Sequence, residues 1–115
     1  MGNTLSKRER LSSKTGIDSL ISRGKFRSAE GIRYCFLEGN GEEINRILIS
    51  VPKKLFKRAV KRNLLKRRIR EAYRTQKGIL TKSGVDILFI YSSKEIFSYE
   101  VIKEKVKNIL MTINS

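Results

Sequence analysis

Three stretches of the chain carry the apolar patterns of β-strands. Residues 31–37 alternate between two faces, which predicts a strand in a sheet that has two different sides. Residues 44–51 contain a continuous apolar run and are expected to form a central strand that Pro52 ends. Residues 85–91, VDILFIY, predict a third strand. The alternation in the first strand places Ile32, Tyr34 and Phe36 on one face and Arg33, Cys35 and Leu37 on the other.

Three other stretches repeat apolar residues at the spacing of α-helices. The first lies within residues 11–21 and ends near Gly24, and the last begins near Ser98, which can cap it. A short extra strand is expected near residues 25–28. The order α-β-β-α-β-α predicts a single-domain, two-layer α+β sandwich over residues 1–115, with a polar, flexible segment at residues 1–9.

The middle helical stretch, residues 53–77, carries most of the charge. Twelve of its 25 residues are Lys or Arg and one, Glu71, is acidic, so it holds +11 of the chain's net +15. Apolar residues recur within it at helical spacing, which predicts a folded helix rather than a disordered tail. An ordinary solvated helix face would interleave acids with the bases. A polyanion is therefore the expected partner of this face.

The helix period assigns residues to the two sides of this helix. At about 100° per residue, one face carries Asn63, Arg67, Arg70 and Arg74, with Lys66 beside them. Asn63 is expected near the first turn, where its amide can cap the helix. Arg58 and Arg62 fall on the apolar side, so either the helix begins near them or their stems follow the edge of the core. The opposite, apolar face carries Leu65, Ile69, Ala72 and Tyr73.

Composition excludes several functions. The chain has no histidine and one cysteine, Cys35, which excludes an internal disulfide and His-based catalysis and suits a reducing cytoplasm. The acids are scattered, so we expect no catalytic residues and no carboxylate cluster for metal-assisted hydrolysis. No apolar run approaches the length of a membrane span. Residues 1–6 match the short myristoylation pattern, which we reject because a nucleic-acid partner explains the larger charge block.

One spaced motif in the basic stretch resembles a known family. An Arg-Asn pair, two residues, a Lys-Arg pair, two residues and an Arg occur here as Arg62, Asn63, Lys66, Arg67 and Arg70. Together with Val51-Pro52-Lys53-Lys54 before it and residues 7–11 at the opening, this resembles the bacterial ribonuclease P protein subunit. The resemblance covers roughly residues 7–111.

The resemblance implies a fold, two RNA partners and a division of labour. It implies a left-handed β-α-β crossover, binding of the ribonuclease P RNA subunit and of precursor tRNA, and hydrolysis by that RNA with Mg²⁺. Whether the protein itself holds metal ions stays unknown. The expected contacts to the RNA subunit are Lys53, Lys54, Arg58, Lys61, Arg62, Asn63, Lys66, Arg67, Arg70 and Arg74. The expected cleft for the 5′ leader of precursor tRNA is formed by Lys7, Arg8, Arg10, Ile17, Ile21, Tyr34 and Phe36.

The chain departs from the family pattern, and other functions stay open. Ile17 and Ile21 stand where the first helix of the family often has aromatics, and Pro52 stands where a small residue is more common. Tyr34 and Phe36 could instead belong to the core, and we assign the remaining phenylalanines, Phe26 among them, to packing. A stand-alone RNA- or ribosome-binding module would also explain the charge. A DNA-binding helix is not expected, because an Arg/Lys face supplies phosphate contacts rather than base readout.

Overall fold

A four-stranded mixed sheet forms the middle of the molecule. The computed structural model describes residues 5–115. The strands are β1 (Lys25–Ala29), β2 (Ile32–Glu38), β3 (Arg46–Ser50) and β4 (Val85–Tyr91), in the order β1-β2-β4-β3. β2 pairs with β1 and β4 in antiparallel fashion, and β3 pairs with β4 in parallel. The extra strand expected near residues 25–28 is confirmed as β1.

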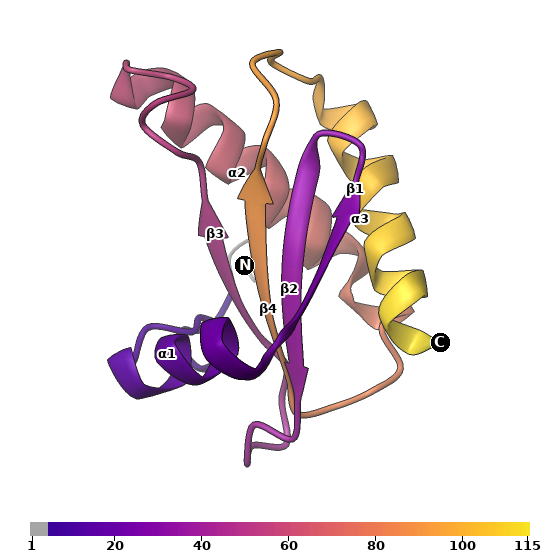
Figure 1. Ribbon diagram of the computed structural model, residues 1–115. Helices are drawn as coiled ribbons and strands as arrows, with labels where there is room; N and C mark the ends of the chain where they lie inside the picture. The colour runs from indigo at the N-terminus through magenta and orange to yellow at the C-terminus, as the bar shows by residue number, and fades with distance from the viewer. Residues whose placement is uncertain (1–4) are drawn as a thin grey trace.

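Helices cover both faces of this sheet. They are α1 (Lys14–Arg23), α2 (Ala59–Gln76) and α3 (Tyr99–Asn114), with short 3₁₀ turns at Lys7–Glu9 and Lys77–Ile79. Figure 1 shows α2 and α3 behind the sheet and α1 in front of it. Ser98 caps α3 as predicted, because its hydroxyl accepts from the amide of Val101. None of the helices in the described part of the chain is long and apolar enough to cross a membrane.

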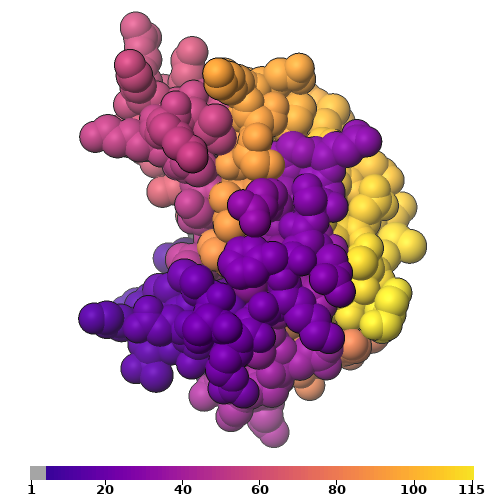
Figure 2. Space-filling model, viewed as in Figure 1, coloured from indigo at the N-terminus to yellow at the C-terminus, as the bar shows by residue number. Residues whose placement is uncertain are grey.

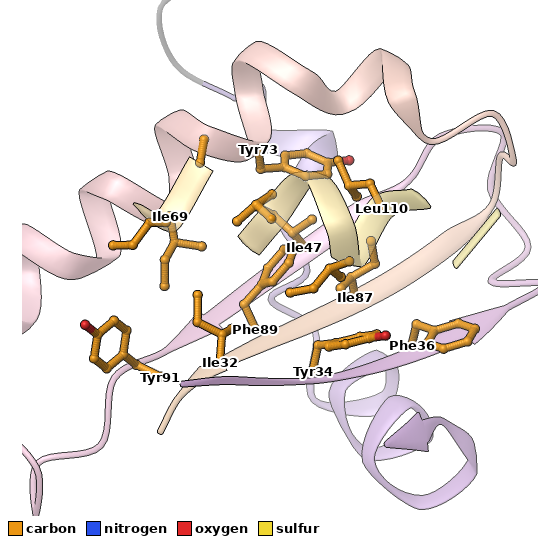
Figure 3. Close-up of a cluster of buried hydrophobic side chains, with 14 of the residues drawn as sticks. Ile32, Tyr34, Phe36, Ile47, Ile69, Tyr73, Ile87, Phe89, Tyr91 and Leu110 are labelled. Carbon is orange, nitrogen blue, oxygen red and sulfur yellow. The ribbon is translucent and has the colours of Figure 1, made fainter. Parts of the chain in front are cut away.

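The core lies mainly between the sheet and the pair α2 and α3. Ile32, Tyr34 and Phe36 of β2 point into it, beside Ile69 and Tyr73 of α2 (Figure 3). The predicted apolar face of α2 is buried as expected. A smaller cluster on the other face joins α1 to the sheet, and Cys35 lies within it. The predicted two-sided alternation of β2 is therefore confirmed.

The connection from β3 to β4 has the rarer hand. Figure 1 shows β3 and β4 pointing the same way, with β4 to the right of β3 and α2 crossing behind the sheet between them. This arrangement is a left-handed β-α-β crossover, against the general right-handed rule. The expectation that residues 44–51 form a central strand is wrong, because β3 lies at the edge of the sheet. Its apolar residues are instead covered by α2 and the N-terminal segment.

The N-terminal segment is fixed to that edge from residue 5 onward. Leu5 is buried in the core, and the Leu11 amide donates to the carbonyl of Ile47 at 2.9 Å. Glu9 pairs with Lys77 at 2.6 Å. The expected flexibility is therefore wrong for residues 5–9, because one buried leucine and one ion pair anchor them. Residues 1–4, with most of the myristoylation-like pattern, lie outside the described residues.

A buried ion pair joins β3 to β4 on the α1 side. Asp86 is 2% exposed, and both of its oxygens accept from the guanidinium of Arg46, at 2.8 and 2.9 Å. The side-chain amide of Asn40 donates to the same carboxylate at 2.8 Å. The hydrogen bonds from Arg46 to Asp86 raise the pKa of the arginine. Asp86, which stands alone in an apolar strand in the sequence, is thus fully partnered.

Candidate nucleic-acid interface

A cationic cavity, which we call the basic groove, opens along the edge of β3. It has a volume of about 260 Å³ and lies between the N-terminal segment, β3 and α2. Three cations line it, Arg10 from the N-terminal segment and Lys66 and Arg70 from α2. Its wall includes the apolar Leu48 and Ile49. Figure 2 shows this side of the molecule hollowed between α1 and the chain that leads into α2.

The packing of α2 and β3 explains why these cations converge. The buried stripe on α2, which includes Leu65 and Ile69, fixes the rotation of the helix. Lys66 and Arg70, four residues apart, then face the same way one turn from each other. Arg10 joins them because it forms a parallel bridge with Ile47 of β3. The groove therefore brings Arg10 close to two cations that follow it by 56 or more positions in the sequence.

No carboxylate of residues 5–115 forms an ion pair with the cations of the groove. Among residues 5–115, the ion pairs leave Arg10, Lys66, Arg67 and Arg70 without an acidic partner. Like charges at i, i+4 oppose helix formation by a few tenths of a kcal/mol per pair. Burial of the apolar side of α2 offsets that cost, and an RNA backbone would relieve it. The arrangement suits phosphate binding, which fixes position without reading sequence.

The other predicted contacts on and before α2 extend the cationic surface. Asn63 lies in the second turn, because α2 begins at Ala59, so the expectation that its amide caps the helix is wrong. Arg58 is the N-cap residue, and its side chain makes no capping hydrogen bond. The side chains that face solvent are those of Lys53, Lys54, Arg58, Lys61, Asn63 and Arg67.

Two of the predicted contacts are engaged within the protein. Arg62 donates to the carbonyl oxygens of Phe56 and Lys57, both at 2.8 Å, and so ties the loop before α2 to the helix. Arg74 pairs with Glu71 at 2.6 Å. The hydrogen bond from Arg74 lowers the pKa of Glu71 and raises that of Arg74. Contact of these two arginines with RNA would compete with the hydrogen bonds that they make within the protein.

The residues expected to form the leader cleft do not all meet. Tyr34 and Phe36 are 3% and 8% exposed and face α2 and α3, on the other side of the sheet from α1. Their assignment to a cleft with α1 is therefore wrong, and the alternative assignment to the core is right. Ile17 packs against the smaller cluster and Ile21 is 50% exposed, both on α1.

The three expected N-terminal cations also separate. Arg10 lines the basic groove, and Lys7 is exposed on the 3₁₀ turn. Arg8 lines a different cavity of about 340 Å³, beside Glu9 and Tyr73. Burial raises the pKa of Tyr73 to about 12, with a further contribution from the charge of Glu9. Tyr73 therefore stays neutral at physiological pH.

One aromatic that the sequence pattern assigned to packing lies at the surface. Phe26 of β1 is 41% exposed, and the guanidinium carbon of Arg33 lies 5.7 Å from the centre of its ring. Phe26 pairs with Cys35, so both face the α1 side. The sequence signal for an exposed Phe26 is its position in a short strand directly after the glycine that ends a helix. Only the position of β1 at the sheet edge explains its exposure.

The acids of the described chain are dispersed. No group of three or more Asp, Glu or Cys residues lies close enough together within residues 5–115 to hold a metal ion. Asp86 is bound by Arg46 and Asn40, and Glu9 by Lys77.

Comparison with known proteins gives one consistent result. The family model described as Ribonuclease P matches residues 5–114. A ribonuclease P protein component from Borrelia hermsii is 36% identical over 104 residues, which cover 90% of each chain. One from Thermotoga maritima is 33% identical over 118 residues, 98% of each chain. A solved structure of the Thermotoga maritima RNase P protein has a TM-score of 0.81 at 32% identity, over 94% of this chain and 100% of that one.

Proposed function

Because this chain belongs to the ribonuclease P protein family and has a role in tRNA processing, we propose that it is the subunit that helps a catalytic RNA remove the 5′ leader of precursor tRNA. The observation that carries the proposal is the basic groove with the cationic face of α2 beside it. Cations without acidic partners, held by a folded helix, suit an RNA backbone.

We assign the two RNA partners to different parts of this surface. The outward residues of α2 and of the loop before it, from Lys53 to Arg70, contact the RNA subunit. The groove end near Arg10 and the α1 side of the sheet receive the single-stranded leader. A groove lined by both cations and apolar residues suits a single strand, whose backbone and bases need different contacts. The proposal includes a cytoplasmic location.

We assign the hydrolysis itself to the RNA subunit and its Mg²⁺ ions. The acids of the described chain are dispersed or already paired, and the chain has no histidine, so the usual protein groups for phosphodiester hydrolysis do not converge. The protein contributes binding and charge. Catalytic RNA and precursor tRNA repel each other, and a +15 protein between them reduces that repulsion.

The protein should therefore accelerate cleavage most when Mg²⁺ is scarce. Divalent ions screen phosphate repulsion as the protein does, so we expect the advantage of RNA plus protein over RNA alone to shrink as Mg²⁺ rises. Cleavage of precursor tRNA across a Mg²⁺ titration measures this. An advantage that stays constant at every Mg²⁺ concentration would contradict the screening role. Specific cleavage by rigorously RNA-free protein would overturn the assignment of the chemistry.

A further inference from the structure

Phe26 and Arg33 form an exposed ring and guanidinium pair on the α1 side of the sheet. Phe26 lies opposite Cys35, and Arg33 is two residues from Cys35 on β2, so the two side chains are diagonal neighbours. The guanidinium carbon is 5.7 Å from the ring centre. A large aromatic gains roughly 1.5–3 kcal/mol when buried. Phe26 is nevertheless 41% exposed.

The backbone around Gly24 holds this ring in place. Gly24 ends α1 and begins the short turn into β1. A side chain at this position would meet the carbonyl oxygen of Leu20, and its Cβ would lie 2.5 Å from the Cys35 sulfur. The close approach that glycine permits brings β1 against β2 directly after the helix. Phe26 is therefore part of a rigid surface rather than of a loop.

An open strip of sheet connects the pair to the basic groove. One row of paired residues crosses the sheet from Leu48, which lines the groove, to Phe26 at the other end. Helix α1 covers the middle of this row. Three inter-strand spacings separate Leu48 from Phe26, about 14 Å. The next row faces the same side and none of its residues is buried, so it leaves a path for an extended chain. That row consists of Ser50, Ile90, Arg33 and Ser28.

We propose that Phe26, with Arg33, stacks an unpaired base of the precursor tRNA leader after the strand has crossed from the basic groove. This inference rests on the proposed function and names a positioning residue for it. A ring with a guanidinium over it offers a stacking face for a base and a cation for the adjoining phosphate. The pair supplies the stacking that α1 cannot provide, since the exposed large apolar residue of α1 is the aliphatic Ile21.

Phe26→Leu tests the stacking without removing apolar bulk. Stacking is worth about 1–3 kcal/mol per base, so the affinity of the RNA and protein holoenzyme for precursor tRNA with a long leader should fall about 5- to 150-fold. Affinity for mature tRNA, and for precursor with a leader of a single nucleotide, should not change. Phe26→Tyr should retain the wild-type preference. Met111→Ala is the matched control, since Met111 is a 52% exposed apolar residue on α3.

The same proposal can be checked with the unaltered protein. A leader that carries 2-aminopurine at successive positions should lose fluorescence at one position when the holoenzyme binds, and Phe26→Leu should restore it. If wild-type holoenzyme shows no preference for leader-bearing tRNA, the proposed function fails. If that preference is present and folded Phe26→Leu keeps both it and the fluorescence loss, the stacking role alone is overturned.

Discussion

Replacement of Lys66, Arg67 and Arg70 by alanine should weaken binding of the RNA subunit about a thousandfold. Each is a cation without an acidic partner among residues 5–115, and a hydrogen bond to a charged group is worth about 1.5 kcal/mol or more. Each lost phosphate contact also removes roughly 0.7–0.9 from the slope of log K against log salt, so that slope should fall by about two units. Filter binding across a salt series measures both quantities.

A second triple variant separates position from net charge. Lys94, Lys103 and Lys107 are exposed and lie on α3 or in the loop before it, so their replacement by alanine removes the same three charges elsewhere. This control should lose little affinity. Equal losses from both variants would show that only the overall charge of the protein matters. An unchanged slope in the folded α2 variant would remove α2 from the interface.

Arg46→Met should destabilise the fold by about 3–5 kcal/mol. It leaves the carboxylate of Asp86 buried, with the Asn40 amide as its remaining hydrogen-bond donor, and a buried charge stripped of its partner has a cost of this size. In a domain of this length each kcal/mol corresponds to roughly 4 °C or more in the thermal midpoint. Urea and thermal unfolding of the two proteins measure the difference.

The double variant Arg46→Met, Asp86→Leu is the matched control for that loss. Exchange of both partners for apolar residues of similar volume removes the unpaired charge, and such exchanges are often close to neutral. The double variant should recover most of the stability that the single variant loses. A single variant that loses less than about 1 kcal/mol would show that Asn40 and water satisfy Asp86 without the arginine.

Local pattern predicted most of the fold. Residues 85–91 form a strand with the predicted bounds, because an apolar run with flanking turn residues has few alternatives. The apolar stripe of α2 predicted its buried residues, since helix rotation follows directly from the 3.6-residue period. The family resemblance supplied the left-handed crossover, which local pattern would have predicted with the other hand.

Features that depend on distant parts of the chain were not predictable in this way. An apolar run such as residues 47–49 indicates burial, but here α2 and the N-terminal segment provide it rather than two flanking strands. Leu5 gives no periodic signal, so its anchoring was missed. Asp86 has its partner 40 residues away, and no local rule connects the two.

The candidate site was predicted only in part, again because some of its features depend on distant parts of the chain. The helix period identified the cations of α2, but it could not show that Arg62 folds back onto two carbonyls. Strand alternation grouped Tyr34 with Phe36 correctly, yet it does not say which helix covers which face. Because α2 and α3 cover the face that carries Tyr34 and Phe36, both rings are buried in the core, whereas Phe26 on the other face is exposed.

The RNA that copurifies with this protein from its native cells tests the central claim most directly. The chain should carry one long, structured RNA in large excess over all others, and the variant with alanine at residues 66, 67 and 70 should lose it. The isolated complex should then process precursor tRNA. A mixture of unrelated RNAs, unaffected by the variant, would contradict the account and favour a general RNA-binding module. Copurified DNA would contradict both.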